Sequence, residues 1–394
     1  MTEDLVVDGA FETCGDVKAS LRVEVLEDLD SVFALRDSIE DLCQDLVEPN
    51  VFFEPWFLFP ALRHLGTNEE FRFLCLYEVG GQRRLCGMLP LAVTKLHRLL
   101  PLRIHQAWAH QQCFRCTPLV RRGFADAFWC EVLSWLGNSP WHRRLLELQR
   151  FPISGEIGRD LQAVLRQRPA FRTQLYRYET AFLRCGPSYD NVLQRAMSRS
   201  SRSKLGRKRR RLARSGSLQF TEAGEGGSLD RLIDEFLELE ASGWKGRAGT
   251  ALASRQREAA FFRDVIHAAY DRGRLVILSL KLDGRMIAAR CALLAPSGAF
   301  HFKSAYDEAY GRFSPGTLTA MEETRRMHDP DDALRADLTW ADSCAGPGDG
   351  ATYQCWPDRM AIARLRITPH WAPHALPLVV WGVIHRMAQA RSRS

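Results

Sequence analysis

The apolar and polar positions between Leu275 and Met327 predict three antiparallel strands followed by a helix. The expected strands are Val276–Leu282, Arg285–Ala295 and Ala299–Ala305, separated by Asp283-Gly284 and by Pro296-Ser297-Gly298. Ser314-Pro315-Gly316 then opens the helix, because Ser can cap a helix and Pro suits its first turn. A helix that begins where a strand ends is a good place to hold a phosphate.

Helices are expected on either side of this pattern. Apolar residues in 229–237 recur at helical spacing, and a second helix is expected over Ser254–Asp271. Ser188–Met197 predicts another helix, which the basic run after it continues until Ser215-Gly216, with an interruption at Gly206. A strand is expected at Ala333–Trp340.

The N-terminal half repeats the same order of elements. A helical stripe runs from Leu29 to Leu46, Pro55 opens a short aromatic helix within Phe52–Leu65, and residues 71–93 form a hairpin pattern like that of 273–295. Two copies of one α/β unit agree with the two domains expected of 394 residues. The predicted division is a leader at 1–20, domains at 21–187 and 188–367, and a basic tail at 368–394.

The positive charge of the chain is concentrated in one segment. The net charge is +7, yet ten Lys and Arg residues and no acid lie between Arg195 and Arg214, so the rest of the chain is near −3. On a helix these charges surround the axis and repel one another. Leu205 and Leu212 are the apolar residues through which such a helix can pack.

Four interpretations of the basic segment remain open. It holds the phosphates of CoA or a polyanionic acceptor, it binds RNA through salt-dependent contacts, it lies on anionic lipid together with the basic tail, or it is a solvated helix. Arg207, Arg210 and Arg211 are the candidate anion-binding residues. No aromatic residue lies between Tyr189 and Phe220, which argues against a dedicated binder of single strands.

Composition points to a cytoplasmic protein. The N-terminus is acidic and has no apolar core, so it does not have the form of a secretory signal. The apolar run Ala375–Ile384 is interrupted by Pro377 and is too short to span a bilayer. Eleven cysteines without a signal suggest free thiols, and Cys113 and Cys116 lack the second pair that a zinc ribbon needs. No metal site is therefore expected.

Four segments between 188 and 365 resemble one enzyme superfamily. They are SKLGRKRRRLARSGSLQF, FLELEASGWKGRAGTAL, FKSAYDEAYGRFSPGTL and ADSCAGPGDGATYQCWPDR, and FFEPWFLFPAL and CFRCTPLV in the first half match more loosely. Together they resemble the GNAT acetyltransferases in their tandem form. Within that superfamily the chain is most similar to the CelD/BcsL-type proteins of cellulose biosynthesis, which are related to the FemAB peptidyltransferases.

The resemblance implies a fold and an activity. The fold would be α/β (α+β), with tandem GNAT-like domains whose mixed, mostly antiparallel, twisted sheets are flanked by helices. The enzyme would move an acyl group from acyl-CoA to an amino or hydroxyl group of a polysaccharide or cell-envelope precursor, without a covalent intermediate. FemAB relatives use aminoacyl-tRNA instead. The segment Arg312–Thr317 stands where the family has a glycine-rich pyrophosphate loop, and Pro315 removes one N–H donor there.

Candidate site residues follow from their positions and from the resemblance. Tyr306 would protonate the leaving thiolate, Asp307 would hold or deprotonate the acceptor, and Asp342 would be a second acid, although both aspartates also fit ordinary turns. The donor would be held by Arg312, Ser314, Gly316 and Thr317, and the acceptor by Trp244, Lys245, Lys303, Tyr310 and Trp356. Glu322 and Glu323, within the donor-site helix, are expected to be mostly solvated.

Three functions remain open at this point. The first is an acyl-CoA-dependent acyltransferase of the cytoplasm with a small-molecule or glycan-precursor acceptor. The second is an aminoacyl-tRNA-dependent transferase. The third is a non-catalytic protein that has kept the fold and binds RNA or the membrane surface through Arg195–Arg214.

Overall fold

The computed structural model describes residues 20–67, 69–81, 83–96, 103–140, 143–168, 170–185, 188–225, 227–329, 331–332, 335, 337–348 and 350–369. The predicted leader, except Ser20, and the predicted tail beyond residue 369 lie outside these ranges. The chain forms two compact units, which are described separately. The N-terminal unit is Met1–Pro55, Asn68–Arg177 and Ala361–Ser394, and the C-terminal unit is Trp56–Thr67 and Tyr178–Met360.

The N-terminal unit combines a mostly antiparallel sheet with helices. Its helical segments are α1 (Leu29–Ala34), α2 (Arg36–Cys43), η1 (Val51–Phe53), α4 (Ala125–Asn138) and α5 (Glu156–Gln167). Its strands are β1 (Ser20–Leu26), β2 (Phe71–Val79), β3 (Arg84–Lys95), β4 (Arg103–Ala107), β5 (Leu119–Val120) and β6 (Leu146–Pro152), and β13 (Asp358–Pro369) pairs with β6. The pattern predicted as one helix over 29–46 is two, because the chain leaves the helical conformation at Leu35.

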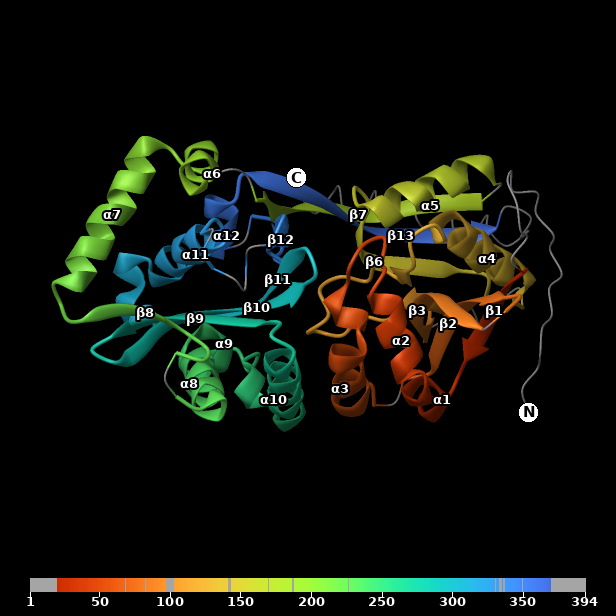
Figure 1. Ribbon diagram of the computed structural model, residues 1–394, viewed down its shortest axis with the longest axis horizontal. Coiled ribbons are helices and arrows are strands. Elements are labelled where there is room, and N and C mark those ends of the chain that lie inside the picture. Colours follow the sequence, from red (N-terminus) through yellow and green to blue (C-terminus); the bar gives the residue numbers. More distant parts are fainter. Residues whose placement is uncertain are drawn as a thin grey trace. The chain divides into compact units, whose positions relative to one another are not determined.

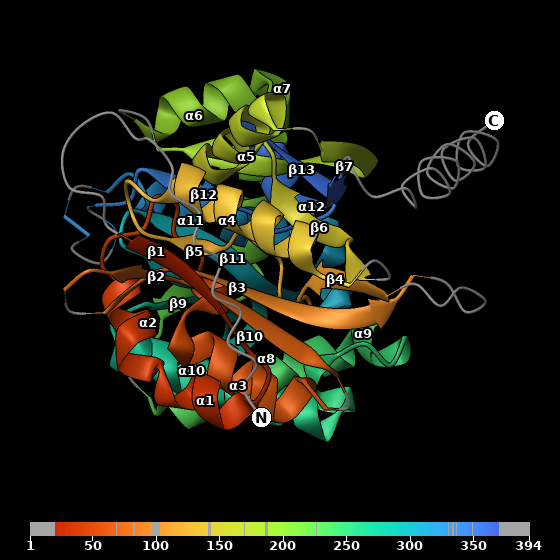
Figure 2. The same ribbon diagram turned by 90° about the vertical axis from the view of Figure 1, so that its right-hand side faces the viewer.

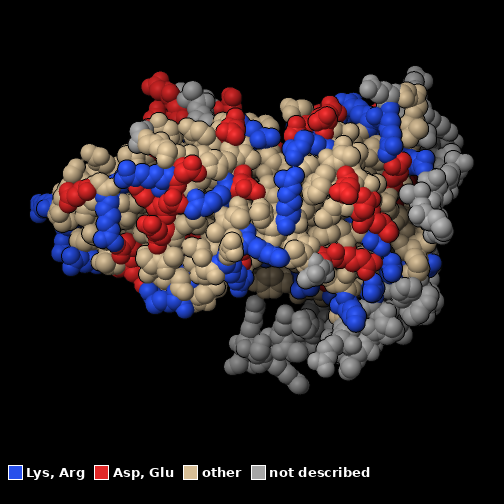
Figure 3. All heavy atoms as spheres, turned by 90° about the horizontal axis from the view of Figure 1, so that it is seen from below, with Lys and Arg blue, Asp and Glu red and all other residues tan. Residues whose placement is uncertain are grey.

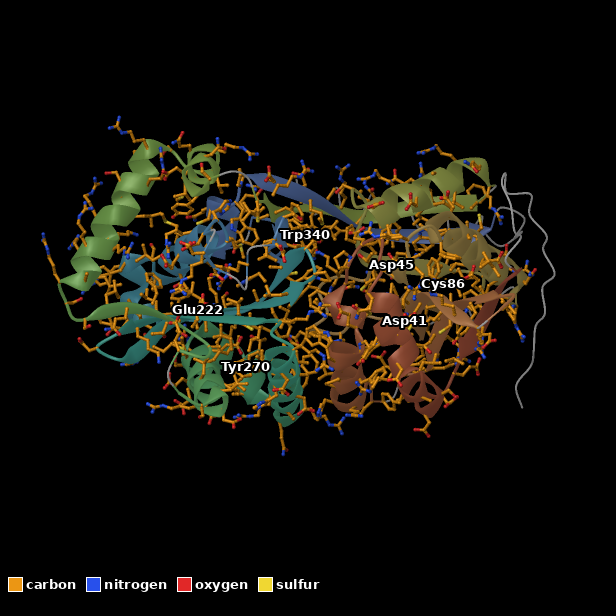
Figure 4. The ribbon with its side chains drawn as sticks, viewed as in Figure 1. Asp41, Asp45, Cys86, Glu222, Tyr270 and Trp340 are labelled. Carbon is orange, nitrogen blue, oxygen red and sulfur yellow. The ribbon has the colours of Figure 1, made fainter. Side chains whose placement is uncertain are left out.

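Ion pairs in which one partner is buried hold parts of this unit together. Arg121 is buried, and its guanidinium lies 2.5 Å from the carboxylate of Asp41 (Figure 4). Glu147 on β6 is fully buried and accepts hydrogen bonds from Arg364 and Arg366 of β13. Burial raises the pKa of Glu147, whereas the two arginines lower it by a larger amount, so its pKa lies below the usual value. These contacts fix β13 to β6, and so to the sheet of this unit.

The C-terminal unit has helices on both faces of its sheet. Its helical segments are α3 (Pro55–Leu65), α6 (Tyr189–Ala196), α7 (Arg199–Ala213), α8 (Leu229–Ser242), α9 (Trp244–Arg247), η3 (Leu252–Ser254), α10 (Gln256–Asp271), η4 (Glu308–Phe313), α11 (Pro315–Arg326) and α12 (Gly350–Cys355). Its strands are β8 (Leu218–Glu222), β9 (Leu275–Leu282), β10 (Arg285–Ala295), β11 (Gly298–Tyr306) and β12 (Trp340–Asp342), together with the part of β7 (Ala170–Arg184) from Tyr178 onward. Figures 1 and 2 show α8 and α10 on one face of β9–β11 and α11 on the other.

The predicted order of two helices, a three-stranded meander and a helix is confirmed, and so is the mixed α/β fold class with its mostly antiparallel sheets. The strand order is β7-β12-β11-β10-β9-β8, and only β11 and β12 run parallel. The helical stripe at 229–237 faces inward, because Ile233, Phe236 and Leu237 are buried. Helix α3 joins the same core through Phe57, whose ring lies 5.3 Å from that of Phe261.

The basic segment contains one break, at a different place from the one predicted. Helix α6 ends at Ala196, and Ser198 caps α7 by accepting a hydrogen bond from the N–H of Ser201 at 3.2 Å. Helix α7 then continues through Gly206 to Ala213. The burial of Leu205 and Leu212 offsets the ~1 kcal/mol cost of glycine in a helix, so the predicted interruption at Gly206 is wrong.

The strand predicted at Ala333–Trp340 is also wrong in extent. Only Trp340–Asp342 forms a strand, and the described residues before it do not. Arg335 explains the difference, because its buried guanidinium turns inward to the carboxylate of Glu222 on β8, 2.5 Å away (Figure 4). A charged residue held in this way fixes a turn rather than an edge strand.

The first prediction concerns Gly206. A Cβ added there would meet only the end of the Arg210 side chain, at 3.6 Å. Gly206→Ala should therefore raise the free energy of unfolding by about 0.5–1 kcal/mol, since alanine loses less entropy in a helix. Urea titration followed by circular dichroism measures this. A loss of stability would mean that the helix needs glycine at this place.

Candidate active site

The site is organised around strands β11 and β12, which are paired over a short stretch and then separate. Strands β11 and β12 are paired at Gly298–Trp340, Ala299–Ala341 and Phe300–Asp342 only, while β11 continues to Tyr306. Trp340 (Figure 4) fastens the paired end, because a Cβ on Gly298 would lie 2.1 Å from its ring. The Trp340 ring also stacks on Phe182 at 5.9 Å and meets Phe300 edge-on at 5.1 Å. No described strand accompanies the second half of β11 on the β12 side.

A β-bulge follows the point where these strands separate. His301 is opposite Ala292 and Lys303 is opposite Cys291, so Phe302 is the extra residue. A bulge turns neighbouring side chains to the same face. Lys303 is half-buried, and its burial lowers its pKa to about 8, with Lys245 acting in the same direction and Glu240 against it.

The start of α11 lies just beyond β11. Pro315 occupies the first helical turn as predicted, but Ser314 is in the left-handed conformation (φ 57°), and its hydroxyl makes no capping bond to the helix. That hydroxyl instead accepts a hydrogen bond from the ammonium of Lys208 on α7, at 2.7 Å. Thr317 and Leu318 donate their N–H groups to the Ser314 carbonyl, and the N–H of Gly316 has no such bond within the described chain. An anion at this end would therefore meet side chains as well as the backbone.

Helices α8 and α9 lie beside the end of β11 on the other face. Trp244 is 55% exposed, and its N–H donates to the Glu308 carboxylate at 2.9 Å. The ammonium of Lys245 bonds both to the buried carboxylate of Glu240, at 2.7 Å, and to the Ser304 carbonyl, at 3.0 Å. The predicted residues Trp244 and Lys245 are thus fixed next to the last residues of β11.

The three predicted catalytic residues differ in their surroundings. Tyr306 is 41% exposed at the end of β11, and a Cβ on Gly316 would lie 3.7 Å from its ring. The carboxylate of Asp307 accepts from the N–H of Ala309 at 3.0 Å and from Arg285 at 2.8 Å. Asp342 is buried and accepts from the N–H of Cys344 at 2.8 Å. Both aspartates fit the alternative turn role, whereas Tyr306 lies open beside α11.

Other predicted residues lie apart from this arrangement. The ring of Trp356 is fully buried, and its indole N–H donates to Thr324 at 2.9 Å, so it belongs to the core rather than to a substrate site. Tyr310 is partly buried against the same core, and Arg312 is exposed with its guanidinium 4.7 Å from the Phe313 ring. Among the described residues, no group of three His, Cys, Asp or Glu side chains is placed to hold a metal ion.

Two residues that shape the site, Lys208 and Glu323, were not predicted from the sequence. Lys208 was counted only as part of a basic run. Glu323 was expected in solvent, yet it is fully buried, and its carboxylate accepts hydrogen bonds from Arg290 on β10 at 2.7 Å. Arg290 also donates to Thr352 at 3.1 Å, and His301 lies 3.9 Å from the Glu323 carboxylate, with burial holding its pKa well below the usual value. Arg290 within the apolar strand β10 was the available signal, because a charge there needs a buried partner.

One protein-family model matches part of the chain. Residues 199–345 match the family model described as an acetyltransferase (GNAT) domain. The C-terminal unit thus carries a GNAT-type acetyltransferase domain. No curated protein matches the sequence. Every helix within the described ranges is too short or too polar to span a bilayer.

One solved structure, that of FemX, shows the same fold. The crystal structure of FemX aligns with a TM-score of 0.56 at 12% identity, over 90% of this chain and 99% of its own. L-PGS from Bacillus licheniformis aligns at 0.46 (11% identity, 88% and 95% covered). A tandem GNAT protein from the clavulanic acid biosynthesis pathway aligns at 0.39 (14% identity, 88% and 98% covered). At these identities the FemX likeness shows the fold alone, and the two lower scores carry no argument about the GNAT domain.

The second prediction concerns the buried pair beneath the site. Glu323→Gln removes the charge that compensates Arg290, so the free energy of unfolding should fall by about 3 kcal/mol. Asp234→Asn is the control, because Asp234 pairs with Arg263 at the exposed surface and should cost less than ~1 kcal/mol. Urea titration of both variants decides. Equal, small losses would contradict the structural importance of the buried pair.

Proposed function

We propose that this GNAT-type protein transfers an acyl group from acyl-CoA to an amino or hydroxyl group of a polysaccharide or cell-envelope precursor, as the CelD-type resemblance implies. The observation that carries the proposal is the contact between Lys208 and Ser314 at the start of α11. It adds a positive charge to a helix N-terminus, which already favours an anion. The donor's pyrophosphate is the anion of the proposed substrate.

The separation of β11 from β12 supports a placement of donor and acceptor on either side of the end of β11. The acyl-bearing arm of the donor would extend along β11 beyond Phe300, from the bulge toward α11. The acceptor would approach from α8 and α9, where Trp244 is exposed and Lys245 is held by Glu240. Both substrates would then meet near Lys303 and Tyr306, in a ternary complex.

The proposed chemistry is a direct displacement. The acceptor nitrogen or oxygen forms a bond to the thioester carbonyl carbon, and the carbon–sulfur bond breaks. The leaving thiolate takes a proton from the Tyr306 hydroxyl, and the acceptor releases its proton to water. Asp307 holds η4, which connects Tyr306 to α11, through its bonds to Ala309 and Arg285. Its role in this proposal is to position that segment.

An aminoacyl-tRNA donor is the second candidate. The observation that favours it is the small number of backbone donors at α11, where Pro315 has no N–H and those of Thr317 and Leu318 are already bonded. A pyrophosphate would be held there by few backbone groups. An aminoacyl-tRNA, bound mainly through the phosphates of its RNA backbone, would not need these backbone N–H groups.

The third prediction tests the donor site. Lys208→Ala should weaken binding of acetyl-CoA about tenfold, because one charge-assisted contact to phosphate is worth roughly 1.5 kcal/mol or more. Lys204→Ala removes the same charge one helical turn earlier and should change binding less than twofold. Isothermal titration calorimetry measures both. If wild-type protein binds no acetyl-CoA but binds aminoacyl-tRNA, the acyl-CoA proposal is wrong and the second candidate replaces it.

The fourth prediction tests Tyr306. Tyr306→Phe removes only a hydroxyl from an exposed ring, so the fold should be unchanged while kcat falls at least tenfold with little change in KM. Release of CoA thiol from acetyl-CoA, with glucosamine as the acceptor, gives the rate. Tyr270→Phe on α10 is the control, since its ring is similarly exposed. An unchanged kcat in Tyr306→Phe would remove this residue from the mechanism.

A further inference from the structure

Helix α7 carries far more charge than the donor site uses. Its fifteen residues include eight Lys and Arg, and none of them forms an ion pair with a carboxylate in the part of the chain that the structure describes. Their recorded side-chain contacts are Lys208 to Ser314, Arg207 to Ser203 and Arg209 to the Phe220 ring. Figure 4 shows nitrogen-tipped side chains extending from α7 away from the body of the unit.

The helix has two sides with different partners. Leu205 and Leu212 are buried and define the inner side, and Lys208 lies on the same half, toward α11. With ~3.6 residues per turn, the opposite half carries Arg199 near the start of the helix and a group of four arginines further along. They are the exposed residues Arg207, Arg210, Arg211 and Arg214. Arg207, Arg210 and Arg214 therefore lie opposite the buried leucines, whereas Arg211 lies three residues from Lys208, on the flank nearer the α11 start.

The spacing of charge fits a linear polyanion. At ~1.5 Å per residue, Arg207–Arg214 spans about 10 Å along the axis, so the four arginines of this segment's outer side lie ~3.5 Å apart on average. A strand of a nucleic-acid duplex has one phosphate per ~3.4 Å. Like charges also lie four residues apart in Arg207–Arg211 and Arg210–Arg214, an arrangement that destabilises a helix unless anions compensate it.

Other polyanionic partners fit less well. Lipid-surface helices insert apolar side chains, and the apolar residues of α7 are already buried in the unit. A planar surface would also reach only part of charges that cover more than half of the helix circumference. Single strands are usually held by stacking on aromatic rings, and the outer half of α7 has none.

We propose that the outer face of α7, formed by Arg207, Arg210, Arg211 and Arg214, binds the phosphate backbone of a double-stranded nucleic acid without reading its sequence. The arginines supply planar, bidentate donors that match phosphate oxygens. This binding does not require acyl transfer, because Arg207, Arg210 and Arg214 lie on the side of the helix opposite the buried Leu205 and Leu212.

The fifth prediction tests this surface. Binding of a fluorescent 20-base-pair duplex, as RNA and as DNA of one sequence, is measured by anisotropy at several salt concentrations. Replacing Arg207, Arg210 and Arg214 with Gln should weaken both duplexes at least tenfold at low salt. Three lost phosphate contacts should also make the slope of log K against log salt shallower by about 2.7. Gln keeps helix propensity, so the circular dichroism spectrum should be unchanged.

The control removes the same charge elsewhere. Arg231, Arg257 and Arg272 are exposed on the side of α8 and α10, where acidic and basic side chains are interspersed (Figure 3). Their joint replacement with Gln should leave duplex binding within twofold of wild type, as should Lys208→Ala. Equal losses in the two triple variants would overturn the proposal, since net charge alone would explain them.

Two further outcomes would also overturn it. One is that wild-type protein binds neither duplex. The other is binding to vesicles containing 30% phosphatidylglycerol, lost in the α7 variant, without binding to either duplex, which would make the surface lipid-directed. Acetyl-CoA titration of the same α7 variant should match wild type. A result there reports on the donor site separately, so failure of one proposal is distinguishable from failure of the other.

Discussion

The site depends on one buried ion pair. Arg290 and Glu323 join β10 to α11 in a place where neither charge meets solvent, so each requires the other. Because α11 is fixed through Glu323, its first residues are held at the end of β11, next to Tyr306. Trp340 fixes the opposite end of β11 by packing on Gly298. Between these two attachments, β11 separates from β12.

Helix α7 connects this core to a second surface. Leu205 and Leu212 anchor it, and Lys208 extends from its inner half to Ser314. The outer half of the same helix presents arginines that form no ion pair with any carboxylate of the described residues. A single basic segment thus divides into one residue suited to the donor and a group suited to a separate polyanion. The division follows from the helical period, since residues one position apart differ by ~100°.

Much of the C-terminal unit was predictable from local patterns. The alternation of apolar strands with glycine turns gave β9, β10 and β11, and Pro315 marked the start of α11 within one residue. The errors share one physical cause, which is that tertiary contacts override local preference. Gly206 stays helical because Leu205 and Leu212 are buried, and Arg335 lies in a turn because its guanidinium pairs with Glu222. Glu323 was placed in solvent because nothing local reveals its partner 33 residues earlier.

The sequence by itself determined the fold class, the position of a phosphate-ready helix and the concentration of charge in one segment. These are local properties, set by the spacing of apolar residues and by turn chemistry. Only the tertiary structure decided which predicted residues meet. It placed Tyr306 beside Gly316, moved Trp356 into the core and brought Lys208 to Ser314 across 106 positions of sequence. Contacts at such separations depend on how elements pack, and a linear pattern does not record packing.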